Sequence, residues 1–202
     1  MVDWNRKYRD SPVPLFGTEP NEYLRQALAR SDLAVASALC LGDGDGRNGG
    51  WLAERGVRVT AVDISAVATD QARARDTARG VAVARLVADL ADWEPPPGAA
   101  WDAVVVLYLQ CERDVRRRAL ERAAAALTPG GWVVAEGFTP GAQDDSFLGP
   151  RQPDILYDLA DLTAALPGFR VIEAFTGTTW LEEGERHRGP ARVARLLARK
   201  PF

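Results

Sequence analysis

The stretch that decides the fold reads Ala34-Val-Ala-Ser-Ala-Leu-Cys-Leu41, Gly42-Asp-Gly-Asp-Gly-Arg-Asn-Gly49, Gly50-Trp-Leu-Ala-Glu-Arg-Gly56 and Val57-Arg-Val-Thr-Ala-Val-Asp63. Its first segment is a short apolar run stopped by glycines, which is typical of a buried parallel strand. A glycine-rich turn follows, then a short helix that Gly56 can end in the left-handed conformation, then a second strand over 57–62. Asp63 lies about 20 residues beyond the first glycine, where nucleoside-binding proteins carry an acid for the ribose hydroxyls.

The charges of the loop bear on which nucleoside it binds. Residues 44–49 match the spacing of the dinucleotide fingerprint, which on its own is a weak signal. A pyrophosphate carrying about two negative charges would be repelled by Asp43 and Asp45 at low dielectric. S-adenosylmethionine has no phosphate and offers a sulfonium and an ammonium group, which carboxylates attract. The loop therefore favours S-adenosylmethionine over a nicotinamide dinucleotide.

Residues 39–63 resemble the cofactor-binding half of class I S-adenosylmethionine-dependent methyltransferases. Within that class, Leu41-Gly-Asp-Gly-Asp-Gly-Arg-Asn48 is similar to the branch that includes tellurite-resistance and thiopurine methyltransferases, and Leu127-Thr-Pro-Gly-Gly-Trp-Val-Val134 adds a second point of similarity to the class. Cys40 departs from the pattern, because many members carry there an acid that approaches the methionine ammonium. Asp43 is the candidate to take over that role.

Further elements follow from the sequence pattern. Ser65 is a good N-cap for a helix that Gly80 stops, and strands are expected over 81–87 and 101–108. A helix is expected over 113–127, ended by a turn at 128–131. Strands at 169–175 and 191–198 predict a closing antiparallel hairpin, with 181–189 in its connection.

The resemblance covers nearly the whole chain and implies its organisation. We expect one Rossmann-like α/β domain over 1–202, with a seven-stranded, mostly parallel sheet, an antiparallel C-terminal strand and helices on both faces. Its parts are an N-terminal flap and helix (1–30), a cofactor-binding core (34–137), an acceptor-side loop and helix (138–168) and a C-terminal hairpin (169–202).

Composition excludes several classes of function. A net charge of -3 and a sequence pI near 5.3 give no general attraction to nucleic acid or to an anionic membrane. No run approaches the roughly 20 apolar residues that span a bilayer, and a cytoplasmic location is expected. The single histidine allows no histidine-based metal cluster or catalytic triad, and no metal is expected. Cys40 and Cys111 are expected to be reduced thiols.

The resemblance implies a cofactor-binding set, in which the glycine loop holds the methionine portion, Asp63 the ribose, and Asp89 with Leu90 the adenine. The full set is Trp4, Tyr8, Gly42, Asp43, Gly44, Gly46, Arg47, Asn48, Asp63, Ile64, Ser65, Asp89, Leu90 and Leu107. Phe16, Gln110 and Arg151 are candidates for the acceptor side, and Tyr108 and His187 are candidate catalytic residues. Structural alternatives exist for several of them. The N-terminal aromatics can belong to a loose leader before a helix over 21–29 that packs on the sheet edge, Asp89 and His187 can be turn residues, and Arg151 can be a surface arginine.

The expected activity is methyl transfer from S-adenosylmethionine to a small-molecule acceptor by in-line displacement. A soft sulfur, selenium or tellurium nucleophile needs little help from a base, which agrees with the absence of an obvious one in the sequence. Two alternatives stay open: a noncatalytic module that binds S-adenosylmethionine, and a nicotinamide-dependent oxidoreductase. The acceptor, and whether the protein is a monomer or a homodimer, stay open too.

Overall fold

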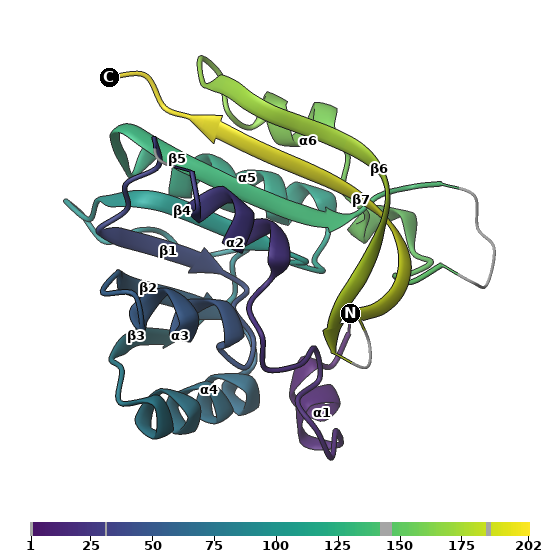
Figure 1. The fold of residues 1–202 in the computed structure, drawn as a ribbon. Coiled ribbons are helices and arrows are strands. Elements are labelled where there is room, and N and C mark those ends of the chain that lie inside the picture. Colours follow the sequence, from purple (N-terminus) through teal and green to yellow (C-terminus); the bar gives the residue numbers. More distant parts are fainter. Residues whose placement is uncertain (1, 31, 142–146, 185–186) are drawn as a thin grey trace.

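The computed structural model describes residues 2–30, 32–141, 147–184 and 187–202 of the 202-residue chain. The strands within those residues are β1 (Ser37–Leu41), β2 (Arg58–Asp63), β3 (Val83–Val87), β4 (Trp101–Leu107), β5 (Leu127–Phe138), β6 (Arg170–Gly184) and β7 (His187–Arg199). They form one seven-stranded sheet in the order β3-β2-β1-β4-β5-β7-β6 (Figure 1). The pairs from β3 to β5 are parallel, and β7 runs antiparallel to both β5 and β6. The predicted α/β fold is confirmed.

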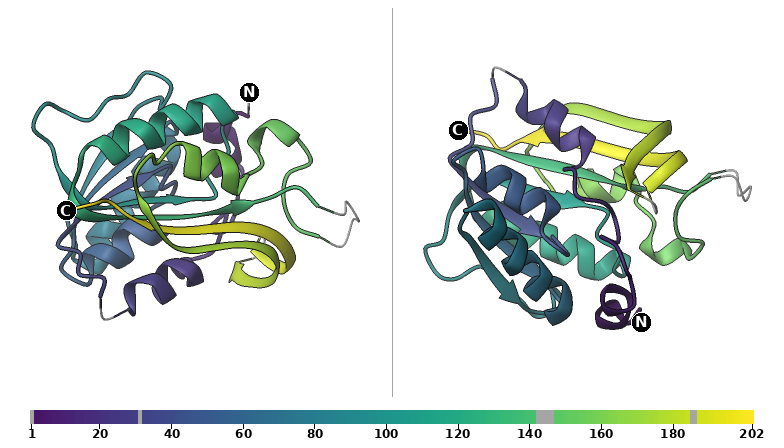
Figure 2. Two further views of the ribbon diagram at one scale, coloured as in Figure 1. Left: turned by 90° about the horizontal axis from the view of Figure 1, so that it is seen from above. Right: turned by 60° about the horizontal axis from the view of Figure 1, so that its bottom comes forward.

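Helices cover both faces of the sheet (Figure 2). They are α1 (Trp4–Arg9), α2 (Glu22–Leu28), α3 (Arg47–Ala53), α4 (Ala66–Arg79), α5 (Arg113–Ala125) and α6 (Leu159–Ala164), with a short 3-10 turn at η1 (Pro153–Ile155). The views of Figure 2 place α5 and α6 on one face and α2, α3 and α4 on the other, while α1 packs beside α4.

Two apolar cores follow from the alternation of side chains along the central strands. On β1, Ala38 and Cys40 join the core beneath α2 and α3, while Leu39 and Leu41 join the core beneath α5 and α6. The strands β4 and β5 alternate in the same way. Central strands buried on both faces therefore read as continuous apolar runs.

Local signals set the bounds of α4 as expected. The Ser65 hydroxyl accepts a hydrogen bond from the backbone N–H of Ala68, and Gly80 ends the helix at φ +67°. No helix was expected at α1, yet Asp3 caps it and Asn5 fixes it to α4 by accepting hydrogen bonds from the Ser65 hydroxyl and the Val67 backbone N–H. These contacts are tertiary, so a local pattern does not carry them.

The predicted bounds of the C-terminal hairpin were wrong. Both strands extend far beyond 169–175 and 191–198, and residues 181–184 and 187–189 belong to the paired strands instead of a loop. The turn expected at 128–131 is likewise part of β5, which is irregular before Trp132. Residues 142–146 of the predicted acceptor-side loop and residues 185–186 of the hairpin lie outside the described residues.

The topology creates a crevice at one edge of the sheet. From β1 the chain moves outward to β2 and β3, then crosses to β4 on the other side of β1. Open α/β sheets bind ligands at such a reversal point, outside the carboxyl ends of the strands. No helix among the described residues has the length and apolar character needed to cross a membrane.

Candidate functional site

The glycine loop between β1 and α3 faces the end of β2. It begins with a hydrogen bond of 2.8 Å from the Gly42 backbone N–H to the carbonyl of Val62. The carboxylate of Asp63 then accepts two backbone hydrogen bonds, from Gly44 to Oδ2 and from Ser65 to Oδ1, each at 2.8 Å. Each oxygen keeps a second lone pair. The acid predicted to bind ribose is therefore held in one orientation and can still accept from a ligand.

The loop makes room for this approach through glycines with positive φ. Gly44 has φ +56°, and a Cβ at that position would overlap the hydroxyl of Tyr8. Gly46 has φ +83° and directly precedes α3. There a Cβ would meet Ala72 at 2.7 Å, so this glycine allows the close packing of α3 on α4.

The two loop aspartates have arginine partners, which were not predicted. Asp43 pairs with Arg85 of β3 at 2.8 Å, and the same guanidinium binds both oxygens of Asp76 at 2.6 and 2.9 Å. Asp45 lies 3.0 Å from Arg75 of α4. The group of Asp43, Asp76 and Arg85 still carries a net charge of about -1 when all three are ionised. The loop therefore repels a pyrophosphate less strongly than expected. Asp43 is also not an unpaired carboxylate available to the methionine ammonium, because Arg85 binds it.

A cavity of about 640 Å³ opens at this edge of the sheet. Most of the predicted site residues line it: Trp4, Tyr8, Phe16, Gly42, Asp43, Gly44, Arg47, Asn48, Asp63, Ile64, Asp89, Leu90, Leu107, Tyr108, Gln110 and His187. Residues that were not predicted also line it: Val2, Asp45, Ala91, Leu109, Cys111, Glu112, Val115, Gln152, Asp154 and Ile155. The volume lies in the range of small-molecule sites.

Three predicted residues are not among those that line this cavity. Gly46 lies behind the loop against Ala72, and Ser65 caps α4. Arg151 is exposed and lines a separate, much smaller depression of about 30 Å³. Its assignment to the acceptor side therefore finds no support in this geometry.

Asp89 and Cys111 line the cavity, where Asp89 is hydrogen-bonded within a turn and Cys111 carries a thiol that stays protonated. Asp89 Oδ1 accepts a hydrogen bond of 2.8 Å from the backbone N–H of Ala91, so this carboxylate organises a turn as well as facing the cavity. Burial raises the pKa of the Cys111 thiol to about 11, which keeps the thiol protonated at neutral pH.

The N-terminal aromatics form one side of the cavity. The rings of Trp4 and Tyr8 lie 6.1 Å apart, and those of Tyr8 and Phe16 lie 6.5 Å apart. The ring of Phe16 also lies 4.9 Å from the ring of His187 in β7. Residues 2–20, called the leader below, thus connect α4, the glycine loop and the hairpin around the cavity. The role of a flap that is expected for them stays a prediction.

Tyr108 and His187 lie side by side in the wall of the cavity. Their ring centroids lie 4.5 Å apart, and Phe138 packs against both at 4.7 and 5.5 Å. Tyr108 has φ +52°, an uncommon backbone conformation for a bulky residue, and its N–H donates to the carbonyl of Glu136 at 2.7 Å. The tyrosine hydroxyl and His187 Nε2 are buried and find no hydrogen-bond partner among the described residues.

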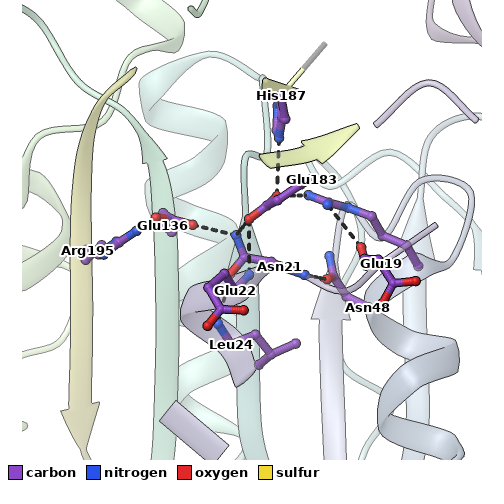
Figure 3. Close-up of polar contacts among 10 residues, drawn as sticks. Glu19, Asn21, Glu22, Leu24, Asn48, Glu136, Glu183, His187 and Arg195 are labelled. Carbon is purple, nitrogen blue, oxygen red and sulfur yellow. Dashed lines mark hydrogen bonds and ion pairs between the residues drawn. The ribbon is translucent and has the colours of Figure 1, made fainter. Parts of the chain in front are cut away.

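A buried polar network lies behind His187 (Figure 3). Asn21 donates through Nδ2 to Glu136 at 2.5 Å and to Glu183 at 3.0 Å, and its backbone N–H donates to Asn48 at 2.8 Å. Arg195 closes the network by donating to Glu136 at 2.6 Å. Asn21, Glu136 and Glu183 were not predicted as functional residues. A buried carboxylate becomes recognisable only when the strands that surround it are known.

The fold and the site define a class of domain, which is a Rossmann-like α/β domain with a glycine loop and an oriented carboxylate at the carboxyl ends of its parallel strands. Residues 38–131, which include the glycine loop and Asp63, match a family model described as a methyltransferase domain. Trans-aconitate 2-methyltransferase of Paracidovorax citrulli (strain AAC00-1) is 35% identical over 163 residues, which are 75% of this chain and 56% of that protein. The chain thus spans little more than half the length of this curated relative.

Solved structures share the fold across almost the entire chain. N-methyltransferase NodS from Bradyrhizobium japonicum WM9, in complex with S-adenosyl-L-homocysteine, has a TM-score of 0.69 and 21% identity, covering 98% of this chain and 97% of NodS. TehB from Haemophilus influenzae has a TM-score of 0.69 and 17% identity, covering 98% of this chain and 65% of TehB. At these identities the likeness concerns the fold.

Proposed function

We propose that this chain transfers a methyl group from S-adenosylmethionine to a small-molecule acceptor. One observation carries the proposal: the region that matches a methyltransferase domain contains both the glycine loop and the carboxylate that the loop orients, and both face the 640 Å³ cavity. The fold shared with NodS in its complex with S-adenosyl-L-homocysteine supports it further.

The residues at the site fit this cofactor. Asp63 has lone pairs free for two ribose hydroxyls, and Leu90 and Leu107 offer apolar surface to the adenine side. Gly42 and Gly44 bring the backbone close to the cavity for the methionine portion. When bound, S-adenosylmethionine supplies an electrophilic methyl group on a sulfonium, and the carboxylates that line the cavity suit its positive charges.

The protein's contribution to the reaction is positioning. Holding acceptor and donor in line can lower the barrier by several kcal/mol, about 7–11 in favourable model systems. The aromatic side formed by Trp4, Tyr8 and Phe16 limits the access of water to the reacting atoms.

Two similarities give starting points for the class of acceptor, and they point to different acceptors. The similarity of the glycine loop to tellurite-resistance and thiopurine methyltransferases suggests a soft sulfur, selenium or tellurium nucleophile, and TehB shares the fold. The curated relative carries the name of trans-aconitate, a polycarboxylate. The charges and side chains around His187 bear directly on this choice.

Calorimetric titration tests the proposal and its alternatives. We expect the purified protein to bind S-adenosylmethionine and S-adenosyl-L-homocysteine at micromolar concentration, and Asp63→Ala to weaken binding at least tenfold. Asp92→Ala removes an exposed aspartate nearby and is the matched control. Preferential binding of NADH would support the oxidoreductase alternative, and tight binding without turnover on any acceptor would support a noncatalytic module.

A further inference from the structure

The two ring nitrogens of His187 have different surroundings. Nδ1 lies 3.4 Å from Oε2 of Glu183, whereas Nε2 is buried without a partner among the described residues (Figure 3). A neutral imidazole beside a carboxylate places its hydrogen on the nitrogen that faces the carboxylate. Nε2 therefore presents a lone pair, and the ring lines the cavity.

Glu183 is held rigidly for this contact. Besides His187, its carboxylate accepts hydrogen bonds from Arg47 at 2.7 Å, from the side chain of Asn21 at 3.0 Å and from the backbone N–H of Glu22 at 3.1 Å. Burial alone would raise the pKa of Glu183, but the hydrogen bond from His187 and the Arg47 guanidinium outweigh it and lower the pKa to about 2. The carboxylate stays ionised and fixed at neutral pH.

The groups around His187 set its own charge. Burial lowers the pKa of the imidazole and the charge of Arg47 adds to this, while Glu183 acts in the opposite direction. On its other sides the ring meets Phe16, Tyr108 and Phe138, which are uncharged. Burial also raises the pKa of Tyr108 well above its usual value, so the tyrosine keeps its proton. The site thus holds a neutral base beside a neutral hydroxyl.

The charges of the cavity wall select among acceptors. Six carboxylates line the cavity within the described part of the chain: Asp43, Asp45, Asp63, Asp89, Glu112 and Asp154. Arg85 and Arg75 compensate Asp43 and Asp45, so the repulsion of an anion comes mainly from the other four. Arg47 is the arginine among these lining residues, and it is already paired with Glu183. A polycarboxylate entering this cavity would meet like charge in a site of reduced dielectric. An uncharged acceptor meets no such penalty.

We propose that His187, positioned by Glu183, accepts the proton of an uncharged acceptor that carries an O–H or N–H group, and that the Tyr108 hydroxyl orients this acceptor. The proposal rests on the proposed function and names its acceptor class. It differs from both starting points above, because a thiolate or a carboxylate reaches the site already deprotonated and needs no base.

The methyl transfer and the proton transfer balance. The acceptor oxygen or nitrogen forms a bond to the methyl carbon while the carbon–sulfur bond breaks, and that bonding pair stays on sulfur as the thioether of S-adenosyl-L-homocysteine. The acceptor proton moves to Nε2 of His187. The resulting imidazolium is stabilised by the Glu183 carboxylate at Nδ1, and the proton later passes to solvent.

Nitrogen-15 NMR tests the base directly, because His187 is the single histidine of the chain and gives the only imidazole signals. In the complex with S-adenosyl-L-homocysteine, we expect the neutral Nδ1–H tautomer at pH 7 and a pKa below 6.5. In Glu183→Gln, the pKa falls further and the tautomers mix, whereas Glu182→Gln, an exposed neighbour on the same strand, changes neither. An imidazolium or an Nε2–H tautomer at pH 7 in the unsubstituted protein overturns the proposal.

Matched acceptors test the chemistry. Phenol and aniline are uncharged at pH 7, thiophenol is largely a thiolate and benzoate is an anion, and all four share one ring. We expect S-adenosyl-L-homocysteine to form with phenol or aniline, at a rate that rises as the pH passes upward through the pKa of His187. His187→Gln should lower this rate by about 10²–10⁴-fold and abolish that pH step. The rate with thiophenol should change less than about threefold in the same variant.

The outcomes separate the two proposals. If S-adenosylmethionine binds but only thiophenol or benzoate is methylated, or none of the four probes is, the proposed base and acceptor class are wrong and the cofactor assignment stands. If S-adenosylmethionine does not bind, the proposed function itself fails. Tyr108→Phe should raise KM for phenol more than it lowers kcat, and the reverse result removes the orienting role.

Discussion

The backbone N–H of Gly44 donates a hydrogen bond of 2.8 Å to Oδ2 of Asp63, which joins the glycine loop to the end of β2. Gly44 can approach so closely because it has φ +56° and no Cβ to overlap the Tyr8 hydroxyl. This contact couples the shape of the loop to the orientation of the acid. Changes in the loop should therefore alter cofactor binding through Asp63 even when they touch no ligand atom.

We predict that Gly44→Ala destabilises the protein by about 2–3 kcal/mol, because about 1–2 kcal/mol of backbone strain adds to the overlap with Tyr8. Affinity for S-adenosyl-L-homocysteine should fall at least tenfold. Gly80→Ala is the matched control, since Gly80 has φ +67° and a Cβ added to it would meet nothing within 4 Å. It should show the backbone strain alone and normal binding. Urea denaturation and calorimetry measure both quantities, and equal effects of the two variants would contradict this account.

We predict a large loss of stability for Arg85→Met. This guanidinium pairs with Asp43 and Asp76, and the side chains of Arg85 and Asp43 are each 2% exposed. Its removal leaves two buried carboxylates uncompensated, which costs about 3–5 kcal/mol. Arg73→Met breaks an exposed pair with Asp70 and one hydrogen bond to the backbone carbonyl of Arg85, and should cost no more than about 1–2 kcal/mol. A urea midpoint for Arg85→Met that matches the midpoint for Arg73→Met would show that the buried cluster contributes little.

The parts of the fold that the sequence predicted are those with local or periodic causes. The strands β1 and β4 read as apolar runs because both their faces are buried, and Ser65 and Gly80 mark the ends of α4 by capping alone. The position of Asp63 beyond the glycine loop follows from the spacing of one strand–turn–helix–strand unit. These features need no knowledge of distant residues.

The missed features depend on contacts between segments that are far apart in the chain. Glu183 lies at an inward position of β6, where a carboxylate normally argues for a loop, and it is tolerated because Arg47 and Asn21 reach it. The hairpin was predicted too short because Gly184 and Gly189 indicated a connecting loop, and the tertiary contacts that allow paired strands there were not known. In the same way, Asp43 was predicted to be a free charge, because Arg85 lies 42 residues further along the chain.

We predict that the contribution of Glu183 to stability disappears in acid. In the folded protein the pKa of Glu183 is about 2, below the ordinary value of 4.5. Between pH 2 and 4.5 the folded state therefore binds fewer protons at this residue than the unfolded chain does. The stabilisation is complete above about pH 4.5 and is lost as the pH falls toward 2, by at most ~3 kcal/mol. The difference in unfolding free energy between the unsubstituted protein and Glu183→Gln should therefore narrow over this range. A difference that is constant from pH 7 to 3 would contradict the lowered pKa.

The last prediction concerns the contact between the leader and the hairpin. Gly17 has φ +85°, and a Cβ on it would overlap the backbone carbonyl of Glu183. Gly17→Ala should therefore push the leader away from β6 and draw Phe16 from His187, whose rings lie 4.9 Å apart. Residues 2–20 should become more sensitive to protease, and affinity for S-adenosyl-L-homocysteine should fall several-fold because one side of the cavity opens.

Gly56→Ala controls for backbone strain in this experiment, since Gly56 has φ +79° and a Cβ added to it would meet nothing within 4 Å. It should leave both the protease pattern and the affinity unchanged, while losing about 1–2 kcal/mol of stability as any alanine in the left-handed region does. If Gly17→Ala behaves in the same way, the leader does not depend on its contact with the hairpin. If bound S-adenosyl-L-homocysteine protects residues 2–20 in the unsubstituted protein and not in Gly17→Ala, the leader closes over the cofactor as a flap.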